Sequence, residues 1–336
     1  MKKTFIFLLM FLSFFLYSQS KDSQSKAKYF YKIATEAPDK SAWISCLDDI
    51  TKEMKTQTNG EVDMKIYPAS TMGDQTAVVN KMKIGQLNGA GLSSGGMQLI
   101  YKDFGVIGFP MLFRTYEEFD YIIDKIGSYI GEKVEENGFV LLAWTEVGLI
   151  YVFSKKKVNS LETLKASKPF LLEGDIVSKS MFDIFNVKAI PLQLSDIVTS
   201  LQTGMIDTVF ASFYALIATQ WWTKVNYGAD FPVTLMIGAM VVDKKLFDSM
   251  PKNYQTMMKE QFSTKFKTLS KKVRQDDLNS RKLLEKQGIK YLPVADKDKE
   301  IFQNTCLNIY NSLTEKEYSR DLLLKVQSTL EEYRKK

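Results

Sequence analysis

The chain has 336 residues, 45% hydrophobic and 25% charged, which is a globular composition and excludes a disordered chain. It contains no histidine, so the commonest general base, the commonest metal ligand and every histidine-based nucleophile pair are missing. The formal charge of +6 is spread along the chain and is too weak to indicate binding to nucleic acid. We therefore expect two lobes of ordinary size, no enzymatic activity, no metal site and no cofactor.

The first 20 residues are typical of an export signal. Two lysines precede an apolar run over residues 5–17, and small residues at 18 and 20 offer a cleavage site. The alternative is an uncleaved membrane anchor, which is disfavoured because the run is shorter than the roughly 20 apolar residues that cross a bilayer. We expect residues 1–20 to be a signal peptide and the mature protein to be periplasmic.

Strand and helix patterns alternate over the first half of the chain. An apolar segment at 29–34 predicts a strand, the helical spacing from Trp43 to Met54 predicts a helix, and alternation at 62–66 predicts a second strand. This order is typical of a βαβ unit with a parallel sheet. Further helices are expected at 76–84 and from Thr115 onward, and further strands at 88–92, 140–144 and 149–153, the last of which should cross between two lobes.

The alternation resumes after a lysine run at 155–157, which predicts a second α/β lobe. Residues 251–287 read as one long charged helix stopped by Gly288, followed by a short strand and two more helices. We place the first lobe at residues 27–149 plus about 229–270, and the second at 150–228 plus about 271–336. In the second lobe, helices are expected at 160–165, 178–185 and 195–204, and strands at 170–172, 187–191 and 205–210.

Several segments, in their order and spacing, resemble the substrate-binding subunits of TRAP (tripartite ATP-independent periplasmic) transporters. The resemblance implies a two-lobed, type II-like periplasmic binding-protein fold with crossing strands and a long hinge-spanning helix. It also implies a ligand in the cleft and delivery to membrane permease subunits. The segments are Ile33-Ala34-Thr35-Glu36-Ala37-Pro38, Ile66-Tyr67-Pro68, Phe109-Pro110-Met111-Leu112-Phe113-Arg114, Trp144-Thr145-Glu146-Val147-Gly148 and Leu201-Gln202-Thr203-Gly204.

The chain departs from this family at the positions that usually hold a ligand carboxylate. By the resemblance, Phe170 stands where the main ligand-binding Arg is expected and Ile150 where a second Arg is usual. Phe210 or Ala211 stands where an Asn is usual. Phe offers no hydrogen-bond donor, and a carboxylate buried without donors is strongly unfavourable. We therefore predict an apolar ligand, such as a lipid, an acyl chain or a hydrophobic small molecule.

The predicted cleft residues combine these positions with neighbouring aromatic ones. Two alternatives stay open: a ligand-free interaction or sensory module on the same fold, and a binder of a small organic acid through a relocated anchor. The missing Arg also suggests a variant system with a tetratricopeptide-repeat protein as a further partner.

The predicted ligand-binding residues are Phe170, Phe210, Ala211, Phe213, Tyr214, Trp144, Ile150 and Glu146, with Trp221 and Trp222 as second choices and Glu36 and Gln202 as further polar candidates.

Overall fold

The computed structural model describes residues 27–335, so the predicted signal peptide lies outside the described residues. Strands and helices alternate along the chain, and the predicted α/β class is confirmed. Among residues 27–335, none of the helices combines the length and the apolar character that a membrane span requires.

One mixed sheet runs along the molecule in the order β10-β8-β4-β9-β3-β1-β2, with β7 paired to β4. The predicted βαβ unit is present, because β1 pairs parallel with both β2 and β3. A separate two-stranded parallel sheet is formed by β5 and β6. The strands are β1 (Tyr29–Thr35), β2 (Val62–Tyr67), β3 (Gly89–Ser93), β4 (Phe139–Ser154), β5 (Phe170–Leu172), β6 (Ile190–Leu192), β7 (Thr208–Ala211), β8 (Tyr227–Ala229), β9 (Thr234–Asp243) and β10 (Lys290–Leu292).

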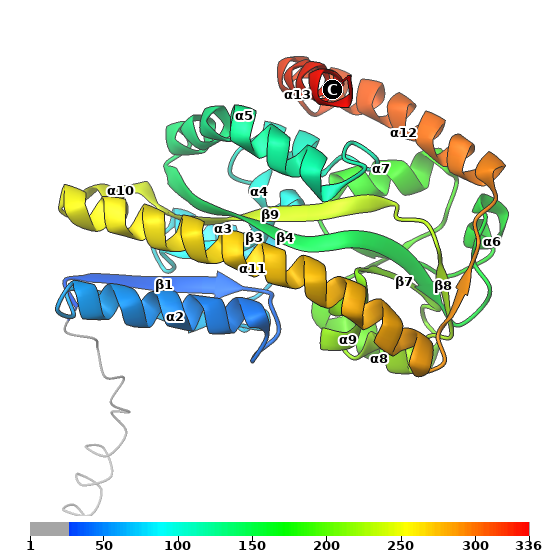
Figure 1. Cartoon of the computed structure of the whole chain (residues 1–336), viewed down its shortest axis with the longest axis horizontal. Coiled ribbons are helices and arrows are strands. Elements are labelled where there is room, and N and C mark those ends of the chain that lie inside the picture. Colours follow the sequence, from blue (N-terminus) through cyan, green and yellow to red (C-terminus); the bar gives the residue numbers. More distant parts are fainter. Residues whose placement is uncertain (1–26, 336) are drawn as a thin grey trace, which may run out of the picture.

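Strand β4 joins the two ends of the sheet. Its first part pairs antiparallel with β9, and its last residues pair with β7 and β8 (Figure 1). The sequence predicts two strands at 140–144 and 149–153, but the structure has one continuous strand. The register against β9 slips between Glu146 and Gly148, where Gly148 has φ +116°, so one extra residue makes a β-bulge. Successive side chains of a strand point to opposite faces of the sheet. The extra residue therefore shifts this alternation, so odd-numbered residues immediately before the bulge and even-numbered residues after it share one face.

The helices cover both faces of this sheet. Helix α2 shows why the pattern works: Ser41 caps its start, and apolar residues spaced by three or four bury one face. The helices are α2 (Ala42–Gln57), α3 (Gln75–Lys83), α4 (Ser94–Met97), α5 (Tyr116–Glu136), α6 (Leu161–Lys165), α7 (Ile176–Ile184), α8 (Ile197–Thr203), α9 (Phe213–Ala218), α10 (Lys244–Asp248), α11 (Lys252–Lys286), α12 (Asp296–Lys316) and α13 (Arg320–Arg334), with 3-10 turns η1 (Lys102–Gly108), η2 (Leu194–Asp196) and η3 (Trp221–Lys224).

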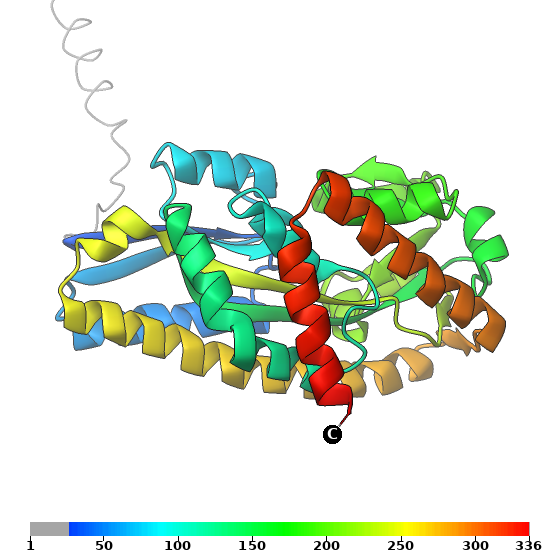
Figure 2. The ribbon, with the colours of Figure 1, turned by 90° about the horizontal axis from the view of Figure 1, so that it is seen from above.

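Helix α11 spans both ends of the molecule and packs on α2, β4 and α9 (Figure 1). Helices α12 and α13 lie on the other side of the sheet from α11 (Figure 2). Helix α12 packs on α7, whereas α13 packs on α5 and η1. The proposed division into lobes stays a prediction, and it assigned α13 to the second lobe although this helix lies against α5 of the first.

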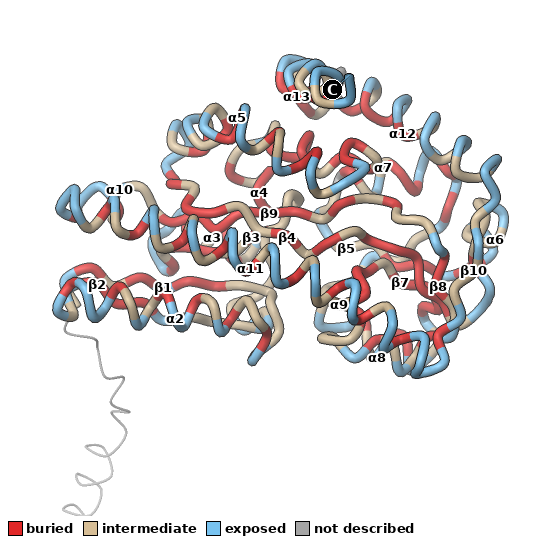
Figure 3. Tube along the Cα trace, in the orientation of Figure 1, coloured by how far each residue is buried: buried red, intermediate tan, exposed pale blue. Residues whose placement is uncertain are grey.

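The buried residues follow the sheet and the inner faces of these helices (Figure 3). One core lies between β1, β2, α2 and α11, and another lies around β7, α8 and α9. A third, larger core joins α5, η1 and α13 to the strands in between. The space between the first two cores contains the cavity described below.

Candidate ligand-binding cavity

A cavity of about 310 Å³ lies between the ends of β1 and β3 on one side and β5, β7 and α7 on the other. Residues of β4 and β9 form its floor, where Thr145, Val147, Ile150, Met236 and Gly238 line the cavity. The cavity is therefore placed where the crossing strands pass from one core to the other.

One wall is polar and consists of Glu36, Gln75 and Ser93, which we call the polar wall. Glu36 follows β1, Gln75 is the first residue of α3, and Ser93 ends β3. The Gln75 amide oxygen accepts hydrogen bonds from the Ser93 backbone N–H and hydroxyl, both at 3.0 Å. A Cβ at Gly96 would lie 1.9 Å from that oxygen, so any larger residue there would displace the Gln75 amide from this position. These contacts fix the orientation of the Gln75 side chain.

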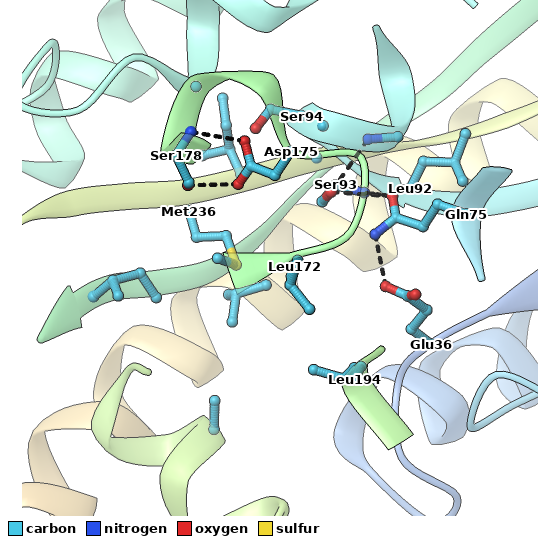
Figure 4. Close-up of a pocket in the computed structure, with 18 of the residues that line it drawn as sticks. Glu36, Gln75, Leu92, Ser93, Ser94, Leu172, Asp175, Ser178, Leu194 and Met236 are labelled. Atoms are coloured by element: carbon cyan, nitrogen blue, oxygen red, sulfur yellow. Dashed lines mark hydrogen bonds between the residues drawn. The ribbon is translucent and has the colours of Figure 1, made fainter. Parts of the chain in front are cut away.

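The amide nitrogen of Gln75 then points at Glu36 and donates a hydrogen bond of 2.6 Å to Oε2 (Figure 4). No other group in residues 27–335 donates a hydrogen bond to the Glu36 carboxyl. Burial raises the pKa of Glu36, and the Gln75 hydrogen bond offsets this rise only in part. Glu36 is thus a cavity-facing carboxyl with one oxygen still open to a donor.

The opposite wall is aromatic and consists of Phe170, Phe182, Phe210 and Trp221, which we call the aromatic wall. The ring of Phe170 meets Phe210 at 6.2 Å and Trp221 at 5.9 Å between centroids, and Phe182 meets Phe210 at 5.6 Å. All three pairs are edge-to-face, the favoured geometry for aromatic rings. This packing holds an apolar surface toward the cavity.

The charges along the cavity have one sign. Its lining includes the carboxyls of Glu36, Asp74, Glu173 and Asp175, and no Lys or Arg of residues 27–335 is among the lining residues. Asp74 and Asp175 accept hydrogen bonds from the first turns of α3 and α7. Gln193 donates to both Asp74, at 3.1 Å, and Glu173. All four acids therefore accept at least one hydrogen bond from a neutral protein group.

Half of the residues predicted from the sequence line this cavity. Phe170, Phe210 and Ala211 come from β5 and β7, and Ile150 comes from β4 beyond its bulge. The second-choice residue Trp221 lines it as well. These positions are brought together by strand pairing, since β7 pairs with the part of β4 that follows Ile150.

Trp144 and Glu146, two of the predicted ligand-binding residues, lie on the other side of β4 and are not among the residues that line the cavity. Trp144 stacks on Phe104 with centroids 5.3 Å apart and packs edge-on to Phe119. Glu146 is bound by both Nε and Nη2 of Arg274 at 2.8 and 2.7 Å. The alternation of β4 sends Thr145 and Val147 to the cavity instead.

Phe213 and Tyr214 start α9 and do not line the cavity. Phe213 stacks on Tyr151 with centroids 4.3 Å apart and belongs to the core. Tyr214 packs on Trp43 of α2 at 5.5 Å, which joins the two sides beside the cavity. Trp43 lines the cavity, whereas Gln202 is exposed on α8.

The sequence reasoning missed several lining residues, among them Gln75, Ser93 and Met236. Gln75 carries no motif of its own, although Asp74 before it is a helix N-cap signal. Ser93 ends a glycine-rich strand, and such a strand often marks a close backbone approach near a cleft. Met236 lies on β9, a strand that the sequence analysis did not predict.

Two known solute-binding proteins are similar in sequence to this chain. A solute-binding protein of Chromohalobacter salexigens is 24% identical over 54% of this chain and 54% of its own length. One of Verminephrobacter eiseniae is 22% identical over 84% of each chain. The match to the first of these spans about half the length of that relative.

Solved structures share the fold over nearly the whole described chain. A TRAP periplasmic solute-binding protein of Ralstonia eutropha, solved with bound (S)-2-acetolactate, has a TM-score of 0.84 and 19% identity, covering 90% of this chain and 99% of its own. One of Desulfovibrio salexigens, with bound orotic acid, has a TM-score of 0.82 and 17% identity, covering 90% and 98%. The predicted two-lobed solute-receptor fold is thereby confirmed.

The family assignment rests on most of the chain. The model of the DctP family, described as bacterial extracellular solute-binding protein, family 7, matches residues 33–317. The chain belongs to this family, and the predicted likeness to the substrate-binding subunits of TRAP transporters is confirmed.

Proposed function

We propose that this protein is the periplasmic receptor of a TRAP-type transporter and that it captures an apolar ligand in the 310 Å³ cavity. The observation that carries the proposal is the apolar lining at the positions where the resemblance leads us to expect polar side chains, with Phe170 and Ile150 in place of Arg and Phe210 in place of Asn. Phe170 and Phe210 face the cavity there, and no Lys or Arg from residues 27–335 joins them in the lining.

The energetics support this ligand class. A buried carboxylate needs charged or polar donors to replace water, and each such hydrogen bond contributes about 1.5–3 kcal/mol. The acids that line the cavity would also repel an anion. In contrast, each buried CH₂ group contributes about 0.8 kcal/mol, so an eight-carbon chain gains about 6 kcal/mol before the costs of association.

A small organic acid is the second candidate ligand. The Ralstonia eutropha and Desulfovibrio salexigens proteins of this fold were solved with bound (S)-2-acetolactate and orotic acid. At 17–19% identity, the likeness shows the fold and does not identify the ligand of this chain. The lining predicts that such acids bind this protein weakly.

The test is native mass spectrometry of the purified mature protein, followed by solvent extraction and lipid analysis. We expect about one apolar molecule per chain, lost in Phe210→Ala because the aromatic wall is truncated. The matched control is Phe231→Ala, since Phe231 is also half-buried but packs on Phe302 outside the cavity. An empty protein that binds small carboxylates instead would reject the apolar ligand.

The delivery step and the export step belong to the same proposal. The family description as extracellular and the basic, apolar start of the chain support export through a cleaved signal peptide. Intact-mass measurement of the exported protein should show a chain that lacks the first 20 residues. Co-purification with TRAP permease subunits tests the delivery step, and a tetratricopeptide-repeat partner stays a prediction of the resemblance.

A further inference from the structure

Glu36 is the half-buried lining acid with a carboxyl oxygen, Oε1, that no group of residues 27–335 reaches; Glu173 also has one such oxygen, but its side chain is exposed. The Oε2 of Glu36 receives one hydrogen bond from Gln75, and in the described residues no second donor reaches the carboxyl. Figure 4 shows Glu36 beneath Gln75, on the side where Leu194 and Leu172 approach. A carboxyl group can accept up to about four hydrogen bonds, so most of its capacity is unused.

The protein cannot supply the missing donor by a simple rearrangement. The Gln75 amide oxygen is held by two hydrogen bonds from Ser93, so this side chain cannot turn its oxygen away without losing both. The nearby acid Asp74 raises the pKa of Glu36 further and offers no donor when ionised. The donor must therefore come from whatever occupies the cavity.

The charge balance of the cavity indicates which kind of donor fits. Asp74, Glu173 and Asp175 accept hydrogen bonds from Gln193 or from helix N-termini, and these donors are neutral. In the described residues no cation lines the cavity to offset the four carboxyls. A positively charged donor would relieve this imbalance and would favour the ionised form of Glu36.

Resting on the proposed function, we propose that the ligand is a cationic amphiphile. Its apolar body packs on the aromatic wall, and its protonated amino group donates to Glu36 at the polar wall. The arrangement pairs a charged group with a charged acceptor inside a largely apolar cavity, where such a contact is stronger than in water. It reverses the charge of the acids bound in the related solved structures.

The first test compares three eight-carbon probes on the delipidated wild-type protein at pH 7 by isothermal titration calorimetry. Octylamine is a cation at this pH, since alkylamines have pKa values near that of lysine, about 10.4. Octanol is a neutral donor and octanoate is an anion, so the apolar chain is constant while the head group changes. We expect octylamine to bind at least tenfold more tightly than octanol and octanoate to bind most weakly.

The second test removes the charge of Glu36. Glu36→Gln keeps the size of the side chain and its acceptor for Gln75, and we expect it to weaken octylamine at least tenfold while changing octanol by less than threefold. The matched control is Glu260→Gln, because Glu260 is an exposed acid on α11 outside the cavity lining. The control should leave all three affinities unchanged, and circular dichroism should show both variants folded.

Two outcomes overturn this proposal without touching the proposed function. Octanol that binds as tightly as octylamine would keep the apolar cavity but remove the cationic head group. Octanoate that binds as tightly as the amine, with affinity rising as the pH falls, would make Glu36 a protonated donor to an acid. Failure of all three probes, together with an empty protein in native mass spectrometry, would reject both proposals.

Discussion

Two acids, the half-buried Glu36 after β1 and the buried Glu146 on β4, are held in opposite ways. Glu146 lies against α11, where Arg274 binds it through two nitrogens and also binds Asp120 at 2.6 and 2.7 Å. The Arg274 guanidinium further lies over the Tyr116 ring, 4.5 Å from its centroid. Glu36 instead receives one neutral amide donor at 2.6 Å.

This difference separates structural charge from charge that is left available. At Glu146 the protein supplies the opposite charge itself, so the pair fixes α11 against β4 and leaves nothing for a ligand. At Glu36 no Lys or Arg of the described residues lines the cavity to pair with the carboxyl. A buried acid therefore suggests a binding site only where the fold has not already paired it.

The largest effect is expected from removing the cation at Glu146. Arg274→Met leaves a buried carboxylate without its partner, which costs about 3–5 kcal/mol of unfolding free energy. Urea unfolding measures this loss, and adding Glu146→Gln to the same chain should recover part of it. Lys272→Met is the matched control on α11: its pair with Asp276 is solvent-exposed, so its loss should cost less than about 0.5 kcal/mol. Equal losses in both variants would contradict the structural role of Arg274.

A second effect, smaller and dependent on pH, is expected at Asp277 of α11. Burial raises its pKa to about 6, although the Tyr214 backbone N–H donates to it at 2.8 Å. The folded state therefore holds a proton that the unfolded chain releases near pH 4, so the contribution of Asp277 to stability falls as the pH rises from about 4 to 6. At about 1.4 kcal/mol per pKa unit, the upper limit is about 3 kcal/mol.

Asp277→Asn removes this titration and should become more stable relative to the wild type as the pH rises over that interval. Thermal unfolding of both proteins between pH 4 and pH 8 measures the difference. A constant difference across the range would show that Asp277 titrates normally and is not desolvated in the folded protein.

The smallest effect on stability is expected at Glu36. Glu36→Gln keeps the Gln75 contact and removes a carboxyl whose charged form burial disfavours, so the unfolding free energy should change by less than about 1 kcal/mol and toward greater stability. The same urea titration at pH 7 measures it. A loss above about 2 kcal/mol would show that the charge of Glu36 supports the polar wall, and the contrast with Glu146 would disappear.

Much of the fold could be predicted because its pattern is local. The spacing of apolar residues in α2 and the alternation in β2 are visible within one window of sequence. Strand β9 was missed because it is buried on both faces and shows no alternation. The single long β4 was read as two strands, since a bulge interrupts its alternation at Gly148.

The lining of the cavity could be predicted only in part. Phe170, Phe210 and Ala211 were predicted through the resemblance and line the cavity, and their role in ligand binding stays a prediction. Glu146 was chosen for its motif, but its partner Arg274 lies 128 residues further along the chain, beyond any local pattern. Gln75 reaches the cavity because Gly96 leaves room for it, a relation between two helices that sequence spacing does not reveal.

The packing of Trp43 of α2 on Tyr214 of α9 gives the molecule a built-in optical reporter. These two rings come from opposite sides of the cavity, with centroids 5.5 Å apart. If α2 and α9 separate to admit a ligand, the Trp43 indole passes from an aromatic neighbour into water, and its fluorescence emission shifts to longer wavelength. The difference in emission between the wild type and Trp43→Phe isolates this signal from that of the other three tryptophans, so the opening of the cavity can be followed without an added label.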